Sequence, residues 1–247
     1  MNNYLRSELY RIKSKKLIYL LPFLLAAIPL LGIFLVWSVG RSDPSFTYNS
    51  TGFLYRFCRI SFNNLVLLLP FLTIYLFASE YSSGTFKNVV ASGISRRHIY
   101  LSKITVIFCI LVLLSVIDIA MIVSAIELLL NHKDLGEKTL FYQNIIQTMP
   151  LFIAAYSISI MLCFTEEKIV SNLVKYFLII YIIPVFLGNF ENIIPGLKSL
   201  LHIFPVIRLS EGLPFTMENL LFNWLEALVY FVAAFVIGLS IFNKKEI

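Results

Sequence analysis

Charged side chains are scarce in this 247-residue chain: 14% of its residues are Asp, Glu, Lys or Arg, whereas 59% are hydrophobic. Soluble domains carry about 25% charged and roughly 45–50% apolar residues. So few polar residues cannot cover a surface that faces water. The composition therefore excludes a soluble enzyme, a disordered chain and a DNA-binding domain, and it leaves an integral membrane protein with little mass outside the bilayer.

Catalytic and nucleotide-binding motifs are also missing. The sequence has no G-x-x-x-x-G-K-[ST], G-x-G-x-x-G, H-E-x-x-H or G-x-S-x-G pattern, so neither a P-loop nor these common catalytic sites are present. The three cysteines form no C-x-x-C pair and the three histidines fall in three loops, which indicates no metal site or disulfide framework. Glu166-Glu167 is similar to the start of the Glu-Glu-x-x-x-Arg motif of intramembrane proteases, but Ser171 stands where that motif needs arginine.

Long apolar stretches are abundant instead, in line with a mean hydropathy of +0.84. A helix that crosses about 30 Å of hydrocarbon needs about 20 apolar residues. The sequence therefore predicts an all-α integral membrane protein, folded as a single transmembrane domain over residues 1–247. Six stretches are long enough to be the spans: 17–39, 60–79, 101–130, 145–165, 172–189 and 221–242. A cleaved signal peptide is the alternative for the first, but its apolar run is longer than the roughly 7–15 residues of such a peptide.

Lysine and arginine are distributed unevenly between the loops. If both termini are cytoplasmic, 13 of the 20 basic residues lie in cytoplasmic segments and 7 in outer loops. This asymmetry fits the positive-inside rule. The net charge of +6 therefore indicates topology in the cell membrane, with both termini inside, and no nucleic-acid partner.

Three segments outside the spans have patterns of their own. Over residues 1–16, Leu5, Leu9 and Ile12 recur at helical spacing among basic residues, which predicts a helix in the headgroup layer; a disordered basic tail is the alternative. The aromatic-rich residues 41–64 are interpreted as an outer loop that anchors the chain at the interface. Between the last two spans, an apolar run too short to cross the bilayer is punctuated by prolines, which predicts a re-entrant or interfacial hairpin on the outer side.

Asp118 lies midway along the third predicted span. A carboxylate inside the membrane is costly and is a functional candidate for that reason. A proton relay, contact with a cationic substrate and a hydrogen bond to a neighbouring helix all fit its position.

The segment after the second span carries the most informative motif. Gly93 should end a short helix there, because a glycine readily adopts the left-handed conformation that terminates helices, and Ser95 should cap the next one. Such a short helix is marginal alone and needs the lipid interface or another protein on its apolar side. In order along the chain, the residues that carry the motif are Glu80, Gly84, Thr85, Phe86, Lys87, Val89, Val90, Gly93, Ser95, Arg96, Arg97 and Lys103.

This order of residues resembles the permease subunits of ABC-2 type exporters, whose loop at this place is the coupling helix that docks on a separate ATPase subunit. In size and character the chain is most similar to the bacitracin-resistance and lantibiotic-immunity permeases of Gram-positive bacteria. The resemblance implies that residues 80–100 form a cytoplasmic coupling segment. The residues implied to contact the ATPase are Glu80, Gly84, Thr85, Phe86, Lys87, Val89 and Val90, and those implied to seat the segment at the membrane surface are Arg96, Arg97 and Lys103.

The resemblance also implies the partners of the chain. They are a dimer of ATPase subunits that binds the ATP, a second permease that is identical or related, the lipid bilayer, and an amphipathic peptide or small hydrophobic substrate. The chain itself would hold no cofactor and carry out no chemistry. An ordinary positively charged loop that only orients the second and third spans is the alternative for residues 80–100.

Two other functions remain open from the sequence. An ion-coupled secondary transporter should show inverted repeats and charges near mid-membrane, but no repeat relates the first three spans to the last three, and Asp118 has no counterpart in the second half. A non-transporting immunity or sensor protein would act without any ATPase. We expect an exporting permease that draws its energy from a partner.

Overall fold

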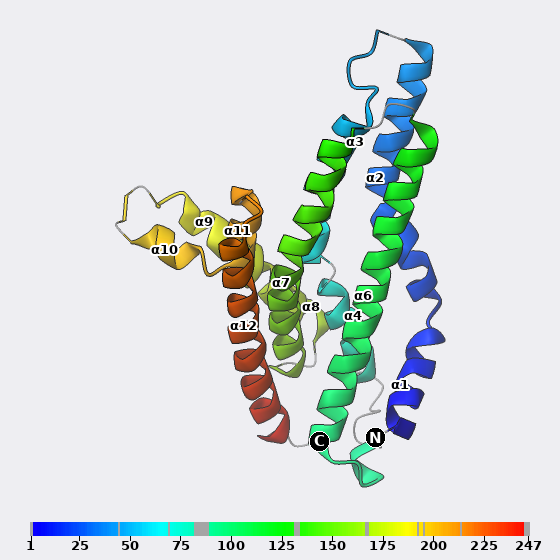
Figure 1. The fold of residues 1–247 in the computed structure, drawn as a ribbon. Helices are drawn as coiled ribbons and strands as arrows, with labels where there is room; N and C mark the ends of the chain where they lie inside the picture. The colour runs from blue at the N-terminus through cyan, green and yellow to red at the C-terminus, as the bar shows by residue number, and fades with distance from the viewer. Residues whose placement is uncertain are drawn as a thin grey trace. The chain divides into compact units, whose positions relative to one another are not determined.

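The computed structural model describes residues 2–43, 45–68, 70–81, 89–130, 134–165, 168–191, 193–194, 196–212 and 214–244. Within these ranges, helices are the only regular elements and no strand is present. The helices are α1 (Asn2–Lys13), α2 (Lys16–Ser42), α3 (Thr51–Leu68), α4 (Phe71–Tyr81), α6 (Arg96–Leu129), α7 (Leu135–Thr165), α8 (Ile169–Phe177), the π-helical η1 (Leu178–Ile182), α9 (Ile183–Gly188), α10 (Leu197–Leu201), α11 (Pro205–Glu211) and α12 (Met217–Lys244) (Figure 1).

Six helical segments are long and apolar enough to cross a membrane, which confirms the predicted all-α, six-span architecture. They cover Ile18–Ser42, Thr51–Phe77, Arg96–Leu129, Leu135–Thr165, Ile169–Gly188 and Met217–Lys244. Several of these helices are longer than the stretches chosen from hydropathy. The limits of the membrane-embedded part of each helix stay a prediction.

The prediction of a loop over residues 41–64 is wrong, because α2 continues to Ser42 and α3 begins at Thr51. Polar contacts extend these helices beyond the apolar stretch. The Arg56 guanidinium pairs with Glu137 at 2.8 Å, and the Asp134 side chain accepts hydrogen bonds from the backbone N–H groups of Gly136 and Glu137, at the start of α7. A carboxylate at the N-terminal end of a helix satisfies otherwise unpaired N–H groups, so α7 starts ten residues before the predicted span.

A proline separates the two helices of the second span, and another follows the π-helical turn of the fifth. Pro70 lies between α3 and α4. Because proline has no backbone N–H, it cannot make the hydrogen bond that would continue a regular helix through this position. The Tyr176 hydroxyl donates a 2.6 Å hydrogen bond to the carbonyl oxygen of Leu67, near the end of α3. In the fifth span, the π-helical turn η1 comes directly before Pro184. By contrast, α2 contains Pro22 and Pro29 and is continuous.

The chain forms two compact units. The first comprises residues 1–9, 66–108 and 147–247, and the second comprises residues 10–65 and 109–146. At the centre of the first unit, the C-terminal half of α7 is buried on almost every side, and small residues such as Ala154, Ala155 and Ser159 allow this close packing. In the second unit, the buried rings of Tyr55 and Phe141 lie 5.6 Å apart between α3 and α7.

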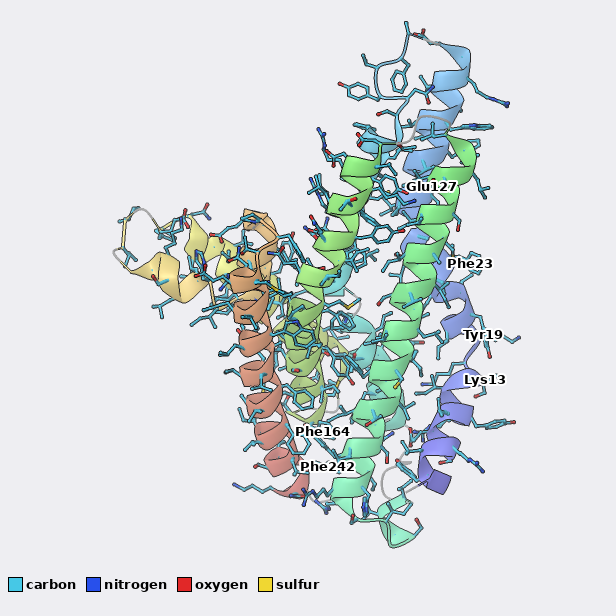
Figure 2. The ribbon with its side chains drawn as sticks, viewed as in Figure 1. Lys13, Tyr19, Phe23, Glu127, Phe164 and Phe242 are labelled. Carbon is cyan, nitrogen blue, oxygen red and sulfur yellow. The ribbon has the colours of Figure 1, made fainter. Side chains whose placement is uncertain are left out.

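An aromatic cluster in the first unit joins four helices. Phe164 of α7 lies 4.6 Å from the ring centroids of both Phe77 of α4 and Tyr100 of α6, and 5.0 Å from that of Phe242 of α12. Figure 2 shows Phe164 and Phe242 facing each other near the end of α12. Other aromatic side chains, such as Tyr19 and Phe23 of α2, are exposed, as expected for surfaces that contact lipid.

Candidate functional site

The predicted coupling segment is described only in part. Gly84, Thr85, Phe86 and Lys87 lie outside the described residues, and Glu80 lies in α4 with its side chain outside the description. Val89 and Val90 belong to a helical turn over 89–91 and are half-exposed. The coupling role of these residues stays a prediction.

The end of this segment follows its local sequence signals. Gly93 has a φ of +84° and its N–H donates to the carbonyl oxygen of Val90 at 3.0 Å, so the turn ends at Gly93 as predicted. The Ser95 hydroxyl then accepts a hydrogen bond from the His98 N–H at 3.4 Å. Ser95 therefore caps α6, whose first residue is Arg96.

The Arg96 side chain contacts the C-terminal end of α12. Its Nη1 donates hydrogen bonds of 2.9 Å to the carbonyl oxygens of Phe242 and Asn243, in the last turn of α12. A cation at a helix C-terminus satisfies free carbonyl groups and interacts favourably with the helix dipole. The neighbouring Arg97 is exposed.

Lys103 forms a buried ion pair that the sequence did not reveal. Its Nζ lies 3.1 Å from Glu8 Oε2, and both side chains are only 2% exposed. The same Nζ lies 5.6 Å from the centroid of the Phe77 ring, above its face. The pair joins α1 to α6 within the first compact unit. The structure thus gives Lys103 an internal partner, and a seating role at the membrane surface stays a prediction.

Residues 1–16 contain the helix α1, and its placement in the headgroup layer stays a prediction. Glu8 and Ile12 are buried, whereas Leu9 is 49% exposed. The side of α1 that is buried within the protein therefore includes the Glu8 carboxylate, whereas Leu9 is left exposed. A single acidic residue within a basic segment was the signal that could have pointed to it.

Asp118 is buried in α6, within the second compact unit, and is 2% exposed. Among the described residues, no hydrogen-bond partner reaches either of its carboxylate oxygens. Of the three predicted roles, a hydrogen bond to a neighbouring helix therefore has no support among these residues, and a proton or cation site remains open.

The segment before the last span contains two short helices, α10 and α11, bounded by glycines with positive φ at Gly196 and Gly212. Figure 1 shows both beside the first turns of α12. The Tyr230 hydroxyl of α12 donates to the carbonyl oxygen of Ile203 at 2.9 Å. His202 Nε2 lies 2.9 Å from Glu211 Oε1, between the two short helices. Whether this hairpin re-enters the membrane stays a prediction.

A buried polar cluster joins this hairpin to α12. Arg208 Nε lies 3.7 Å from Glu226 Oε2, and both side chains are buried. The Asn223 side-chain amide donates to the carbonyl oxygen of Gln147 at 3.2 Å, and the Gln147 amide donates to the carbonyl oxygen of Pro214 at 3.3 Å. Hydropathy alone does not identify Asn223 and Glu226, although two polar residues at i and i+3 in an apolar helix share one side of it.

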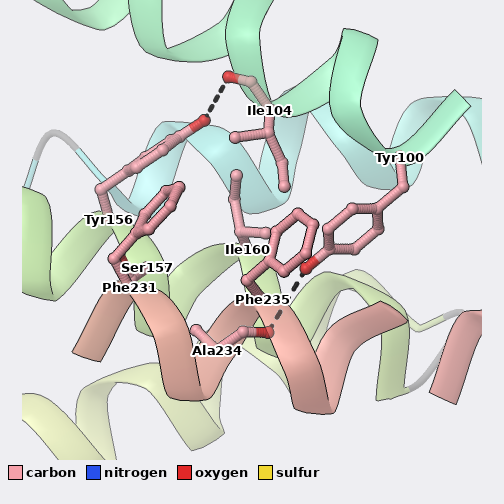
Figure 3. A pocket seen from close by; sticks show the side chains of 8 residues that line it. All are labelled: Tyr100, Ile104, Tyr156, Ser157, Ile160, Phe231, Ala234 and Phe235. Carbon is pink, nitrogen blue, oxygen red and sulfur yellow. Dashed lines mark hydrogen bonds between the residues drawn. The ribbon is translucent and has the colours of Figure 1, made fainter. Parts of the chain in front are cut away.

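A small crevice lies between α6, α7 and α12 in the first unit (Figure 3). Two hydroxyl groups border it: Tyr156 donates to the carbonyl oxygen of Ile104 at 2.6 Å, and Tyr100 donates to that of Ala234 at 3.3 Å. Its volume of about 10 Å³ is enough for about one water molecule. The crevice is therefore too small to hold a transported compound. No group of three metal-ligating side chains occurs in the described part of the chain.

Comparison with known families adds an independent finding. The family described as ABC-2 family transporter protein matches residues 4–185, a region that runs from α1 into α9 and includes the predicted coupling segment and the Glu8–Lys103 pair. No curated protein matches the chain. The family is the membrane component of ABC transporters rather than a catalytic subunit, and it works with an ABC ATPase subunit. The chain therefore belongs to the ABC-2 family of transporter proteins and is a multi-pass membrane permease of an ABC transporter.

Proposed function

We propose that this permease exports an amphipathic or hydrophobic compound, such as an antimicrobial peptide, from the cell membrane in a resistance or immunity system. Two permeases, identical or related, would pair with two ATPase subunits at the cytoplasmic face, where both chain termini lie. Residues 80–100 would be the coupling segment that the ATPase contacts.

The observation that carries this proposal is how the end of that segment is attached. Ser95 caps α6 directly after Gly93, so the segment continues into a long helix without a flexible linker. The first two turns of α6 are joined to α12 through Arg96 and to α1 through Lys103 and Glu8. A displacement of residues 80–100 by a closing ATPase dimer would therefore reach three helices of the first unit at once. Such coupled movement between discrete packings is how a local event becomes a larger transition.

The first experiment is co-purification of the tagged permease with its ABC ATPase subunit from the cells that produce both. Replacing Glu80 and Phe86 with alanine should abolish recovery of the ATPase. Replacing the exposed Tyr10 with alanine is the control and should leave recovery unchanged. Transport by a permease that never binds an ATPase would refute the proposal.

Asp118, whose carboxylate oxygens have no hydrogen-bond partner among the described residues, favours one competing function, an ion-coupled secondary transporter. In that case Asp118→Asn should stop transport, and depletion of ATP with the ion gradients maintained should not. An ATP-driven exporter gives the opposite result for ATP depletion. The resistance role is tested by the growth of cells that express the complex in bacitracin or a lantibiotic, compared with cells whose ATPase subunit is inactivated.

A further inference from the structure

Three buried acceptor oxygens lie on one side of the first half of α12 and have no hydrogen-bond donor among the residues that the structure describes. They are Oδ1 of Asn223 and both carboxylate oxygens of Glu226. The two residues are 1% and 7% exposed. Since they are three positions apart in a helix, their side chains are neighbours. Buried acceptors are normally satisfied by protein or by water, so this pair can accept hydrogen bonds from a donor outside the described chain.

The local donors are committed elsewhere. Arg208 supplies positive charge, but its Nε is 3.7 Å from Glu226 Oε2, which is too long for a hydrogen bond, and it donates to the carbonyl oxygen of His202 at 3.1 Å instead. The guanidinium also lies 4.1 Å from the Phe222 ring centroid. The Asn223 and Gln147 amides donate to backbone carbonyls. Arg208 thus balances the charge of Glu226 without satisfying its oxygens.

The chemistry of the missing donor follows from the acceptors. A primary ammonium group carries one positive charge and three N–H donors, which matches one carboxylate and one amide oxygen. Ca²⁺ needs about six to eight oxygen ligands, and this pair supplies only three. An anion is disfavoured by the carboxylate.

The surroundings indicate what the ammonium group is attached to. Phe222 and Val229 of the same helix, one turn before and one turn after Glu226, are neighbours of Glu226 on the helix surface. Both are exposed, and they belong to a segment apolar enough to lie in a membrane. An apolar chain attached to the ammonium group could lie along them. We propose that Asn223 and Glu226 bind the primary ammonium group of an amphipathic amine, and this assignment rests on the proposed export function because it names the class of compound exported.

Binding has a consequence for the hairpin. Arg208 belongs to α11, and its interaction with Glu226 is one of the contacts between that helix and α12. A ligand ammonium group that donates directly to Glu226 replaces this long contact with shorter ones. Occupation of the site therefore weakens the attachment of α11 to α12 at the place where the ligand sits.

The test is a binding titration on the full chain in phosphatidylcholine nanodiscs. The chain has two tryptophans, so Trp37→Phe leaves Trp224, next to Asn223, as the only tryptophan reporter. Dodecylamine is the probe, and dodecanol is the neutral control with the same alkyl chain. We expect dodecylamine to change the Trp224 fluorescence saturably, with an apparent Kd at least tenfold lower than that of dodecanol.

Variants separate specific binding from partition into the lipid. Glu226→Gln should raise the Kd for dodecylamine at least tenfold, and Arg208→Gln should lower it, because the competing cation is gone. Glu218→Gln, at an exposed position in the first turn of α12, should leave it unchanged. If Glu226→Gln does not give a folded protein, Asn223→Asp should tighten binding by adding a second carboxylate.

Equal responses to the amine and the alcohol, or a Kd that Glu226→Gln and Asn223→Asp both leave unchanged, would overturn the proposal. The titration needs neither ATP nor an ATPase subunit. Its failure is thus distinguishable from a failure of the export proposal, which appears as loss of ATPase co-purification or as transport without ATP.

Discussion

The buried pair between Glu8 and Lys103 gives the sharpest test of the structure. Lys103→Met removes one charge of a pair whose side chains are both 2% exposed and leaves the Glu8 carboxylate buried without its cation. Glu8→Met does the reverse. The double variant removes both charges and replaces them with flexible apolar side chains of similar length.

The size of the effect follows from the geometry. At the observed 3.1 Å, two unit charges attract each other by about 5 kcal/mol at an effective dielectric constant of about 20. Desolvation of the two ions offsets most of this attraction, but removal of one partner takes this attraction away from the other buried charge, and breaking a buried pair in this way typically costs about 3–5 kcal/mol. In a protein of this size, about 1 kcal/mol corresponds to roughly 2–4 °C in the unfolding midpoint. Each single variant should therefore lower the midpoint by about 10 °C.

Thermal unfolding of the detergent-solubilised permease, followed by tryptophan fluorescence, measures these midpoints. The double variant should unfold closer to the wild type than either single variant, because it removes both buried charges together. Arg97→Met, at an exposed position, is the matched control and should change the midpoint by less than about 2 °C. Single variants that unfold like the wild type, or a double variant whose loss equals the sum of the two single losses, would refute the buried pair.

Three further changes test other parts of the structure. Asp118→Leu should stabilise the protein by about 1–3 kcal/mol, because it removes a buried carboxylate with no hydrogen-bond partner among the described residues; a lower unfolding midpoint would contradict this. Gly238→Ala places a Cβ 2.5 Å from the Tyr100 hydroxyl and should destabilise the protein by about 1–3 kcal/mol, whereas Gly188→Ala, whose Cβ has its nearest neighbour at 3.9 Å, is the control that should not. In Gly93→Ala, the added Cβ has no atom within 4 Å, but the alanine is forced to a φ of +84°, at a cost of about 1–2 kcal/mol. This variant should reduce ATPase co-purification if residues 80–100 are the coupling segment. Unchanged recovery would count against that role.

The spans were predictable because bilayer thickness imposes a length of apolar sequence that each helix displays locally. Their ends were less predictable. Thr51 begins a helix whose early turns carry two arginines, Arg56 and Arg59. Those turns are held by contacts such as the pair between Arg56 and Glu137, which are 81 residues apart in the sequence. The capping pattern of Asp134 and Glu137 was a local signal for the start of α7 that hydropathy alone does not detect.

In the candidate sites, too, features set by nearby residues were predictable and contacts between distant residues were not. The positive φ of Gly93 and the cap by Ser95 were expected from sequence, because both depend on neighbours within a few positions. The partners of Lys103 and Glu226 were not, because Glu8 is 95 residues from Lys103 and Arg208 lies on a different helix from Glu226. Sequence patterns show which side of a helix is polar, but not which helix will face it.

Different sets of contacts hold the two ends of the last helix, α12, in place. Near its C-terminus, Phe242 packs in the aromatic cluster with Phe164, and Arg96 donates to the carbonyl oxygens of Phe242 and Asn243. Neither contact involves Glu226. Near its N-terminus, α12 meets the hairpin through Arg208 and Glu226, a contact whose strength depends on charge. A change in the charge at Glu226 can therefore loosen one end while the other stays fixed. Helix α12 can therefore tilt about its C-terminal end when the ionic contact near its N-terminal end is lost.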